Sequence, residues 1–231
     1  MIRVFIGYDG KEAAAYNVLQ HSIQQRASQP VSFTPVRLSH LGDVFTRARD
    51  PLQSTEFSFS RFLTPYLCDY EGWALFMDCD VLCRDDLARL WALRDDRYAV
   101  MVVQHRHEPK EATKFLGQVQ TKYGKKNWSS VMLFNCARCR ALTPEFVNTA
   151  TGLELHQFKW LSGDDEIGGL PRRWNHLVGY DPPNSDAALV HYTSGGPYFQ
   201  EYADCEFAAE WFRERDALLH AEQRTSSARA A

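Results

Sequence analysis

A short apolar run that ends in two carboxylates constrains this chain more than any other stretch. Residues 73–77 are apolar and are followed by Asp78-Cys79-Asp80, after which the chain becomes apolar again. A run this short is typical of a buried strand in a parallel sheet rather than of a long helix. Ligands of open α/β sheets bind beyond the carboxyl ends of the strands, which is where Asp78 and Asp80 would lie. Two carboxylates there repel each other and are costly to desolvate, so they favour a bound cation.

Two interpretations of this Asp-x-Asp pattern stay open. Hard oxygen ligands suit Mg²⁺ or Mn²⁺, which usually leave coordination positions for substrate phosphates, so the pattern could be a metal site that holds a diphosphate. The other interpretation is a turn in which one aspartate caps the next helix. Asp85 or Asp86 already offers such a cap before residues 87–91.

The composition predicts one ordinary α/β domain. The chain has 231 residues and a net charge of -3, which gives no general attraction to nucleic acid or to an anionic membrane. No run approaches the length of a membrane span, and residues 2–6 are typical of a first strand rather than of a signal peptide. The 6 cysteines lack a disulfide framework spacing, which fits free thiols in a reducing cytoplasm. Cys136-x-x-Cys139 favours a core strand running into a turn over a zinc site.

The first strand ends in a Gly-Tyr-Asp-Gly turn at residues 7–10, which two interpretations fit about equally. The glycines could let the backbone approach a nucleotide base, with Asp9 or a main-chain group bonding the edge of that base. Alternatively, Asp9 lies near the start of a helix in a plain strand-to-helix turn. An amphipathic helix is predicted over residues 12–25, with Tyr16 in its first turns, where this side chain either reaches the base or is half-buried.

Further elements follow from patterns along the chain. Pro35 predicts an edge position for a strand over residues 31–38. A core helix is predicted over residues 57–67, where Arg61 is a cation able to meet a diphosphate. Thr143 and the proline after it predict a helix start. A short helix is predicted over 87–94, strands over 98–104, 128–135 and 188–191, and a final helix over 203–221.

Three polar segments could contribute to a site. Residues 105–126 are mostly basic and long for a connection, which fits a lid over an anionic donor, a site for a phosphorylated acceptor, or a solvated surface. Residues 162–166 carry three adjacent acids that fit a surface helix N-terminus or contact with a sugar. His191 ends an apolar run before a glycine-rich turn, so it is either a structural residue or a third metal ligand.

The order of these motifs resembles the GT-A-fold glycosyltransferases, most closely family 8, the retaining hexosyltransferases that include bacterial lipopolysaccharide transferases and glycogenin. Residues 76–81 (Phe-Met-Asp-Cys-Asp-Val), residues 170–175 (Leu-Pro-Arg-Arg-Trp-Asn) and His191 carry the resemblance most specifically, and it runs from Ile2 to about Phe199. The expected fold is α/β, a single Rossmann-like mixed sheet flanked by helices with the Asp-x-Asp at a strand end. We expect one domain over residues 1–222 and a disordered tail over 223–231.

The resemblance also implies roles for matching positions. The implied ligands of Mn²⁺ or Mg²⁺ are Asp78, Asp80 and His191. The implied catalytic residues, beside the donor sugar or the leaving diphosphate, are Asp164, Asp165 and Arg61. The residues implied to line the nucleotide sugar are Gly7, Tyr8, Asp9, Tyr16, Arg61, Asp78, Cys79, Asp80, Ser129, Ser130, His191, Gly195 and Gly196.

The implied activity is transfer of a hexose from a nucleotide-diphosphate sugar, with UDP-sugar as the first expectation, to a glycan or glycolipid acceptor with retention. Front-face substitution is favoured, again by resemblance. A cytoplasmic enzyme that transiently visits the inner membrane to extend lipopolysaccharide or capsule would fit the absence of a membrane segment. No nucleic-acid partner is expected.

The chain departs from the family pattern at several places. The family's Gly-x-x-Lys-Pro-Trp ending carries a lysine that neutralises the leaving diphosphate, whereas residues 195–199 are Gly-Gly-Pro-Tyr-Phe. Trp128-Ser129-Ser130 stands where the family has Asn-Ala-Gly, and the acidic motif lacks its central Gln. The chain therefore looks like a divergent bacterial branch. The groups that could supply the missing charge are Arg61, Arg172, Arg173 and the basic segment 105–126.

Two other functions remain as alternatives. The missing lysine supports a catalytically silent nucleotide-sugar-binding protein. A sugar-phosphate nucleotidyltransferase also uses an α/β sheet and Asp-bound Mg²⁺, but residues 7–11 match its glycine-rich, basic loop poorly.

Overall fold

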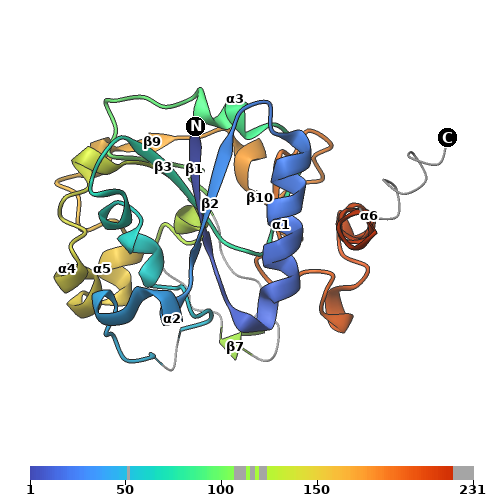
Figure 1. The fold of residues 1–231 in the computed structure, drawn as a ribbon, viewed down its shortest axis with the longest axis horizontal. Coiled ribbons are helices and arrows are strands. Elements are labelled where there is room, and N and C mark those ends of the chain that lie inside the picture. The colour runs from blue at the N-terminus through green and yellow to red at the C-terminus, as the bar shows by residue number, and fades with distance from the viewer. Residues whose placement is uncertain (51–52, 107–112, 115–117, 120–123, 221–231) are drawn as a thin grey trace.

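A six-stranded mixed sheet forms the centre of the protein (Figure 1). The computed structural model describes residues 1–50, 53–106, 113–114, 118–119 and 124–220. The strands of the sheet, in spatial order, are β2 (Val31–Val36), β1 (Ile2–Gly7), β3 (Trp73–Met77), β8 (Val131–Asn135), β5 (Val100–Val102) and β9 (Ile167–Gly169). Neighbouring strands run parallel, except that β8 is antiparallel to both β3 and β5. The expected α/β mixed sheet is confirmed.

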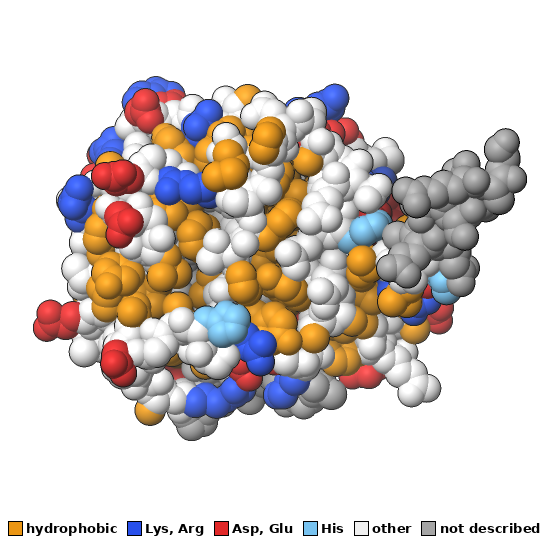
Figure 2. Space-filling view, in the orientation of Figure 1, with side chains coloured by type: hydrophobic (Ala, Val, Ile, Leu, Met, Phe, Trp, Pro, Cys, Tyr) orange, Lys and Arg blue, Asp and Glu red, His pale blue; other side chains and the backbone are white. Residues whose placement is uncertain are grey.

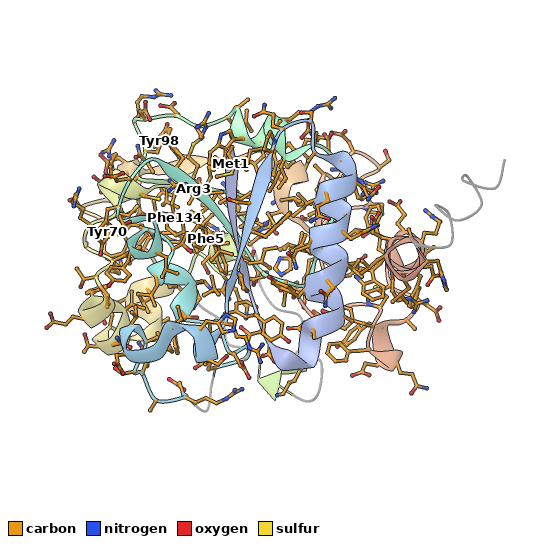
Figure 3. The ribbon with its side chains drawn as sticks, viewed as in Figure 1. Met1, Arg3, Phe5, Tyr70, Tyr98 and Phe134 are labelled. Atoms are coloured by element: carbon orange, nitrogen blue, oxygen red, sulfur yellow. The ribbon has the colours of Figure 1, made fainter. Side chains whose placement is uncertain are left out.

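Burial follows position in this sheet. The central strands β3 and β8 are apolar and almost wholly buried, as a strand covered on both faces requires. At the edge, β2 pairs only with β1 and is half-exposed, and Pro35, which has no N–H to donate, is tolerated there as predicted. Arg3 on β1, labelled in Figure 3, also ties β3 in place, because its Nε donates to the Trp73 carbonyl at 3.0 Å.

A second, three-stranded sheet was not anticipated. It consists of β10 (His176–Leu177), β11 (Leu189–His191) and β4 (Val81–Cys83), with β11 antiparallel to β4. In this pairing His191 lies opposite Val81, and the N–H of Tyr192 donates to the Asp80 carbonyl at 2.9 Å. The pairing therefore brings His191 and Tyr192, which come late in the sequence, next to the Asp-x-Asp. A separate antiparallel pair is formed by β6 (Thr113–Lys114) and β7 (Gln118–Val119).

Helices lie on both sides of the strands (Figure 1). The predicted amphipathic helix is present as α1 (Ala13–Arg26), and α6 (Ala208–Leu219) lies beside it. A buried contact joins the two, with His21 Nδ1 2.7 Å from Glu214 Oε1. The other helices are α2 (Leu38–Leu41), α3 (Leu87–Trp91), α4 (Pro144–Thr149) and α5 (Gly152–His156).

The predicted helix starts are confirmed. Asp86 caps α3 by accepting a hydrogen bond from the Ala88 N–H, and Thr143 caps α4 by accepting from the Phe146 N–H. Of the helices in the described ranges, none combines the length and apolar character that crossing a bilayer requires.

Residues 57–67 do not form the predicted core helix. They contain turns and two short 3-10 segments, Ser60–Leu63 and Tyr66–Cys68. Hydroxyl groups compete for the local backbone: Ser58 Oγ donates to the Thr55 carbonyl at 2.8 Å, and Thr64 Oγ1 donates to the Arg61 carbonyl at 2.9 Å. The three phenylalanines of this stretch, Phe57, Phe59 and Phe62, are nevertheless buried, as the apolar pattern predicts.

Several predicted elements are shorter or different. Residues 128–130 form a 3-10 turn, so the strand begins only at Val131. Residues 164–166 form another 3-10 turn that leads into β9, so the surface helix start that was one of two interpretations of this segment is not present. Cys136 and Cys139 are buried free thiols at the end of β8, which confirms a core strand running into a turn. The expected tail at 223–231 lies outside the described residues.

Candidate active site

Asp78, Asp80 and His191 form a cluster of three potential metal ligands. One donor atom from each lies within 4.8 Å of the other two, and Asp80 Oδ1 is 3.4 Å from His191 Nε2. All three side chains are at most 13% exposed. Two carboxylates and an imidazole form a donor set that Mn²⁺ or Mg²⁺ accepts, and these separations fit ligands arranged around one ion. The cluster could therefore hold a divalent cation, as the sequence predicted.

The two sheets create this cluster. Asp78 directly follows β3, and its N–H donates to the Ser130 carbonyl at 2.9 Å, where the antiparallel β8 is about to begin. Asp80 directly precedes β4, and β11 lies against β4 with His191 at its end. The structure thus brings together residues 78–80, 129–130 and 191, which are far apart in the sequence.

Asn175 sets the orientation of the His191 ring. Its Nδ2 donates to Ser130 Oγ at 2.9 Å and to the Asn127 carbonyl at 3.2 Å. Its Oδ1 therefore faces His191 Nδ1, at 3.1 Å, and an amide oxygen can only accept a hydrogen bond. His191 therefore donates from Nδ1, and its Nε2 is the ring nitrogen that faces Asp80. A histidine held in this tautomer is prepared to bind a metal through Nε2.

Arg61 joins Asp78 to the segment before β8. One terminal nitrogen donates to Asp78 Oδ1 at 2.7 Å and to the Ser129 carbonyl at 2.9 Å, while Nε donates to the Ser58 carbonyl at 3.1 Å. The Arg61 side chain is only 6% exposed, and its guanidinium is held both at Nε and at one terminal nitrogen. It therefore offsets the charge of Asp78 and fixes a cation beside the candidate metal site.

His156, at the end of α5, supports the carbonyl groups that hold Arg61. Its Nδ1 lies 2.7 Å from Ser129 Oγ, and the ring also forms a hydrogen bond to the Ser58 backbone. Burial, together with the nearby charge of Arg61, lowers the pKa of His156 to about 3. The neutral ring donates to the Ser58 carbonyl and accepts from the Ser129 hydroxyl. Sequence analysis missed this residue, because a single histidine among mixed apolar and polar residues carries no periodic signal.

Asp9 and Gly7, at the end of β1, are engaged by the protein itself. Asp9 is 2% exposed, and its two oxygens accept from the N–H groups of Lys11 at 3.0 Å and Glu56 at 3.1 Å. This is the strand-to-helix turn that the sequence allowed. Gly7 is required because a Cβ there would lie 2.2 Å from the Phe57 ring. The group that closely approaches the backbone at Gly7 is therefore the Phe57 side chain of the protein itself.

Two tyrosines lie beside this turn. Tyr8 and Tyr16 pack edge to face with ring centres 5.2 Å apart, and Arg37 lies over the Tyr8 ring at 4.8 Å. Burial raises the pKa of Tyr16. A cavity of about 310 Å³ adjoins the stack, lined by Arg37, Leu38, Ser39, Phe45, Arg47, Arg49, Gln53 and Glu56. On the face shown in Figure 2, several basic side chains lie along the lower margin, below and to the right of the place where Figure 1 labels α2 and close to the place where it labels β7.

Other predicted site residues have mainly internal contacts. The Cys79 thiol donates to Glu12 Oε2 at 3.9 Å within the core, and burial raises its pKa well above the usual value. Gly195 has a left-handed backbone (φ 137°), and a Cβ on Gly196 would lie 2.3 Å from the Tyr198 ring. Gly195 and Gly196 are thus needed for the backbone conformation of the turn that follows His191.

Asp164 and Asp165 are exposed and lie outside the metal-ligand cluster. Asp164 forms an ion pair with Lys125, and its side chain is 73% exposed. Lys125 is one of the few described members of the predicted basic segment. Its members at 107, 110 and 122 lie outside the described residues, and of Lys114 only the backbone is described.

Comparison with known proteins gives the family. A family model described as "Glycosyl transferase family 8" matches residues 11–143. "Protein CDI" of Arabidopsis thaliana is 51% identical over 223 residues, which cover 93% of this chain and 86% of that protein. This relative is a plant protein, so the expected bacterial origin stays a prediction.

Solved glycosyltransferases share the fold. LgtC, a galactosyltransferase in complex with donor and acceptor sugar analogs, aligns with a TM-score of 0.58 at 14% identity, over 94% of this chain and 96% of LgtC. GlyE of Streptococcus pneumoniae aligns at 0.62 and 14% identity, over 98% of this chain and 65% of GlyE. The chain spans 49% of the bifunctional glycosyltransferase WbbM, at 0.60 and 15% identity over 93% of this chain. Because the family model covers more than half of the chain and the plant relative nearly all of it, the protein belongs to glycosyl transferase family 8, with the GT-A fold.

Proposed function

We propose that this protein transfers a hexose from a nucleotide-diphosphate sugar, with UDP-sugar as the first candidate, to a hydroxyl of a glycan or glycolipid with retention of anomeric configuration. Family membership supports glycosyl transfer in general. The observation that supports a metal-bound diphosphate donor is the buried cluster of Asp78, Asp80 and His191 with Arg61 beside it. Mn²⁺ or Mg²⁺ held by the cluster would neutralise charge on the donor diphosphate.

In the proposed reaction the bond between sugar C1 and the β-phosphate oxygen breaks. The acceptor oxygen forms the new bond to C1 on the same face, and its proton passes to the departing phosphate. Negative charge grows on the phosphate oxygen as it leaves. Arg61 is already fixed by Asp78 and two backbone carbonyls, so it can stabilise that charge without reorganising. Asp164 and Asp165 are proposed to bond hydroxyls of the donor sugar.

The remaining parts of the proposal concern the setting of the enzyme. The backbone N–H groups around Gly195 and Gly196 would bind phosphate, and the uridine would lie near Tyr8 and Tyr16. The whole of residues 1–222 would act as one catalytic domain. We propose action in the cytoplasm, with transient contact at the inner membrane during synthesis of lipopolysaccharide or capsule.

Thermal unfolding tests the donor and the metal together. UDP, GDP, CDP and their sugar conjugates are added with and without Mn²⁺ to the wild type and to Asp78→Asn/Asp80→Asn. A ligand at a hundred times its dissociation constant adds about 2.7 kcal/mol, and each kcal/mol moves the midpoint by about 2–4 °C. We expect a Mn²⁺-dependent shift with one nucleotide that is lost in the double variant. No shift with any nucleotide would refute the metal-bound donor site.

A second candidate is a nucleotide-sugar-binding protein without turnover, because residues 195–199 carry no lysine. Release of UDP from a UDP-sugar in the presence of Mn²⁺, even as slow hydrolysis, would exclude it. Binding without turnover on any acceptor would favour it. For an active enzyme, NMR of the product identifies the anomer, and an inverted anomer would contradict retention.

A further inference from the structure

Asn127 has an unusual backbone conformation next to the metal-ligand cluster. Its φ of 64° and ψ of 2° lie in the left-handed region, which asparagine tolerates better than most residues. Its carbonyl accepts hydrogen bonds from Ser130 Oγ at 2.8 Å and from Asn175 Nδ2 at 3.2 Å. The backbone at this position is thus held by two side chains, one of which also orients His191.

The side-chain amide of Asn127 is only half satisfied. Its Oδ1 accepts from Thr193 Oγ1 at 3.3 Å. Its Nδ2 is buried and has no hydrogen-bond partner in the part of the chain that the structure describes. Asn175 differs, because its Nδ2 donates twice and its Oδ1 accepts from His191. A buried donor without an acceptor costs free energy that a ligand oxygen would recover.

The surroundings of Asn127 identify the ligand. Thr193, which holds the amide oxygen, lies two residues after the candidate metal ligand His191, and Ser129, which holds Arg61, lies two residues after Asn127. The amide therefore borders the place where a metal-bound diphosphate would lie. The turn after His191 has no lysine to meet that diphosphate.

We infer that Asn127 donates a hydrogen bond from Nδ2 to an oxygen of the diphosphate of the nucleotide-sugar donor. This inference rests on the proposed function and adds a binding residue to it. Thr193 fixes the amide so that the NH₂ group, and not the oxygen, is directed at the ligand. The uncharged NH₂ group of Asn127 thus supplies part of the hydrogen bonding to the diphosphate that the absent lysine would provide.

Two variants separate the contribution of the Asn127 side-chain amide to ligand binding from that of its backbone conformation. Asn127→Gly keeps the left-handed conformation and the anchored carbonyl but removes the amide. Asn127→Asp keeps the shape and replaces the donor by a carboxylate. Asn184→Gly is the control, because its side chain accepts from the Asp186 N–H within its own turn. Calorimetry with UDP, GDP and CDP, and with the UDP-sugar, each with Mn²⁺, measures the dissociation constants.

We expect Asn127→Gly to bind the preferred nucleoside diphosphate about tenfold to a hundredfold more weakly, the usual effect of losing a hydrogen bond to a charged group. The nucleotide sugar should weaken by the same factor, Asn127→Asp should lose more, and the control should not change. Wild-type affinity in Asn127→Gly or Asn127→Asp would overturn the inference alone, as would weakening confined to the nucleotide sugar. A wild-type protein that binds no nucleotide would overturn the proposed function and the inference together. Unfolding without ligand verifies that each variant is folded.

Discussion

The two ends of the candidate site look alike in the sequence and differ in the structure. In each, an apolar strand runs into an aspartate: β1 into Asp9 and β3 into Asp78. Asp9 receives two backbone N–H groups and is almost fully buried. Asp78 instead meets Arg61 and lies near Asp80 and His191.

The difference shows that a strand-end carboxylate takes its role from the groups that face it. Backbone N–H groups at β1 satisfy the charge of Asp9, so the turn is stable without a ligand. At β3, Asp78 and Asp80 instead lie in one cluster with the side chain of His191, and Arg61 donates to Asp78. A structural end and a candidate ligand-binding end therefore follow two neighbouring parallel strands, β1 and β3.

The largest expected effect is that of Asp80→Asn. We expect kcat/KM for sugar transfer to fall by at least about a hundredfold, because charge stabilisation at the leaving group is lost. Without metal, the unfolding midpoint should stay constant or rise, because the amide relieves repulsion from Asp78. Enzyme assays with Mn²⁺ and thermal unfolding with EDTA measure the two quantities.

Asp9→Ala is the matched control and should behave in the opposite way. Loss of the turn cap and of the acceptor for the Glu56 N–H should destabilise the fold by about 2 kcal/mol. The Mn²⁺-dependent shift with nucleotide should persist. If Asp9→Ala abolished that shift and left stability unchanged, the two ends would have the same role.

Gly7→Ala tests the structural end more directly. The added Cβ would lie 2.2 Å from the Phe57 ring, and overpacking of this kind typically costs about 1–3 kcal/mol. Urea unfolding measures the loss. In a double-mutant cycle, Phe57→Leu should recover part of it. Additive effects of the two substitutions would contradict a direct clash.

His156 makes stability depend on pH. Its pKa is about 3 in the fold and about 6.5 in the unfolded chain, so below pH 6.5 only the unfolded chain takes up a proton. Stability therefore falls with falling pH between 6.5 and 3, by about 2 kcal/mol at pH 5. His156→Gln should be less stable at pH 7 but should lack this decline. Urea unfolding of both proteins at pH 7 and pH 5 measures it, and equal declines would refute the assignment to His156.

Patterns local in the sequence predicted much of the fold. The strand before the Asp-x-Asp, the first helix, the edge strand with Pro35 and the cap at Thr143 are all present. The stretch 57–67 failed, because hydroxyl-to-backbone bonds overrode an apolar spacing that fits a helix. Such bonds depend on side-chain geometry that a spacing rule does not contain.

The supporting residues of the site could not be predicted in the same way. Asn175 and His156 act through hydrogen bonds to residues 16 and 27 positions away, and Asn127 is identified by a missing partner. The antiparallel course of β8 and the pairing of β11 with β4 create these contacts. Sequence motifs named residues at the ends of strands, but the tertiary fold decides which neighbours they receive.

The smallest expected effect concerns the exposed rim. Asp164→Asn removes an ion pair with Lys125 in which the carboxylate is 73% exposed, and such pairs contribute about 0.2–1 kcal/mol. Unfolding in urea should change by less than about 0.5 kcal/mol at moderate salt. If Asp164 bonds the donor sugar as proposed, kcat/KM should fall far more than stability. A loss of stability without a loss of activity would make Asp164 structural, like Asp9, and would leave the ligand-binding end to the strand-end cluster alone.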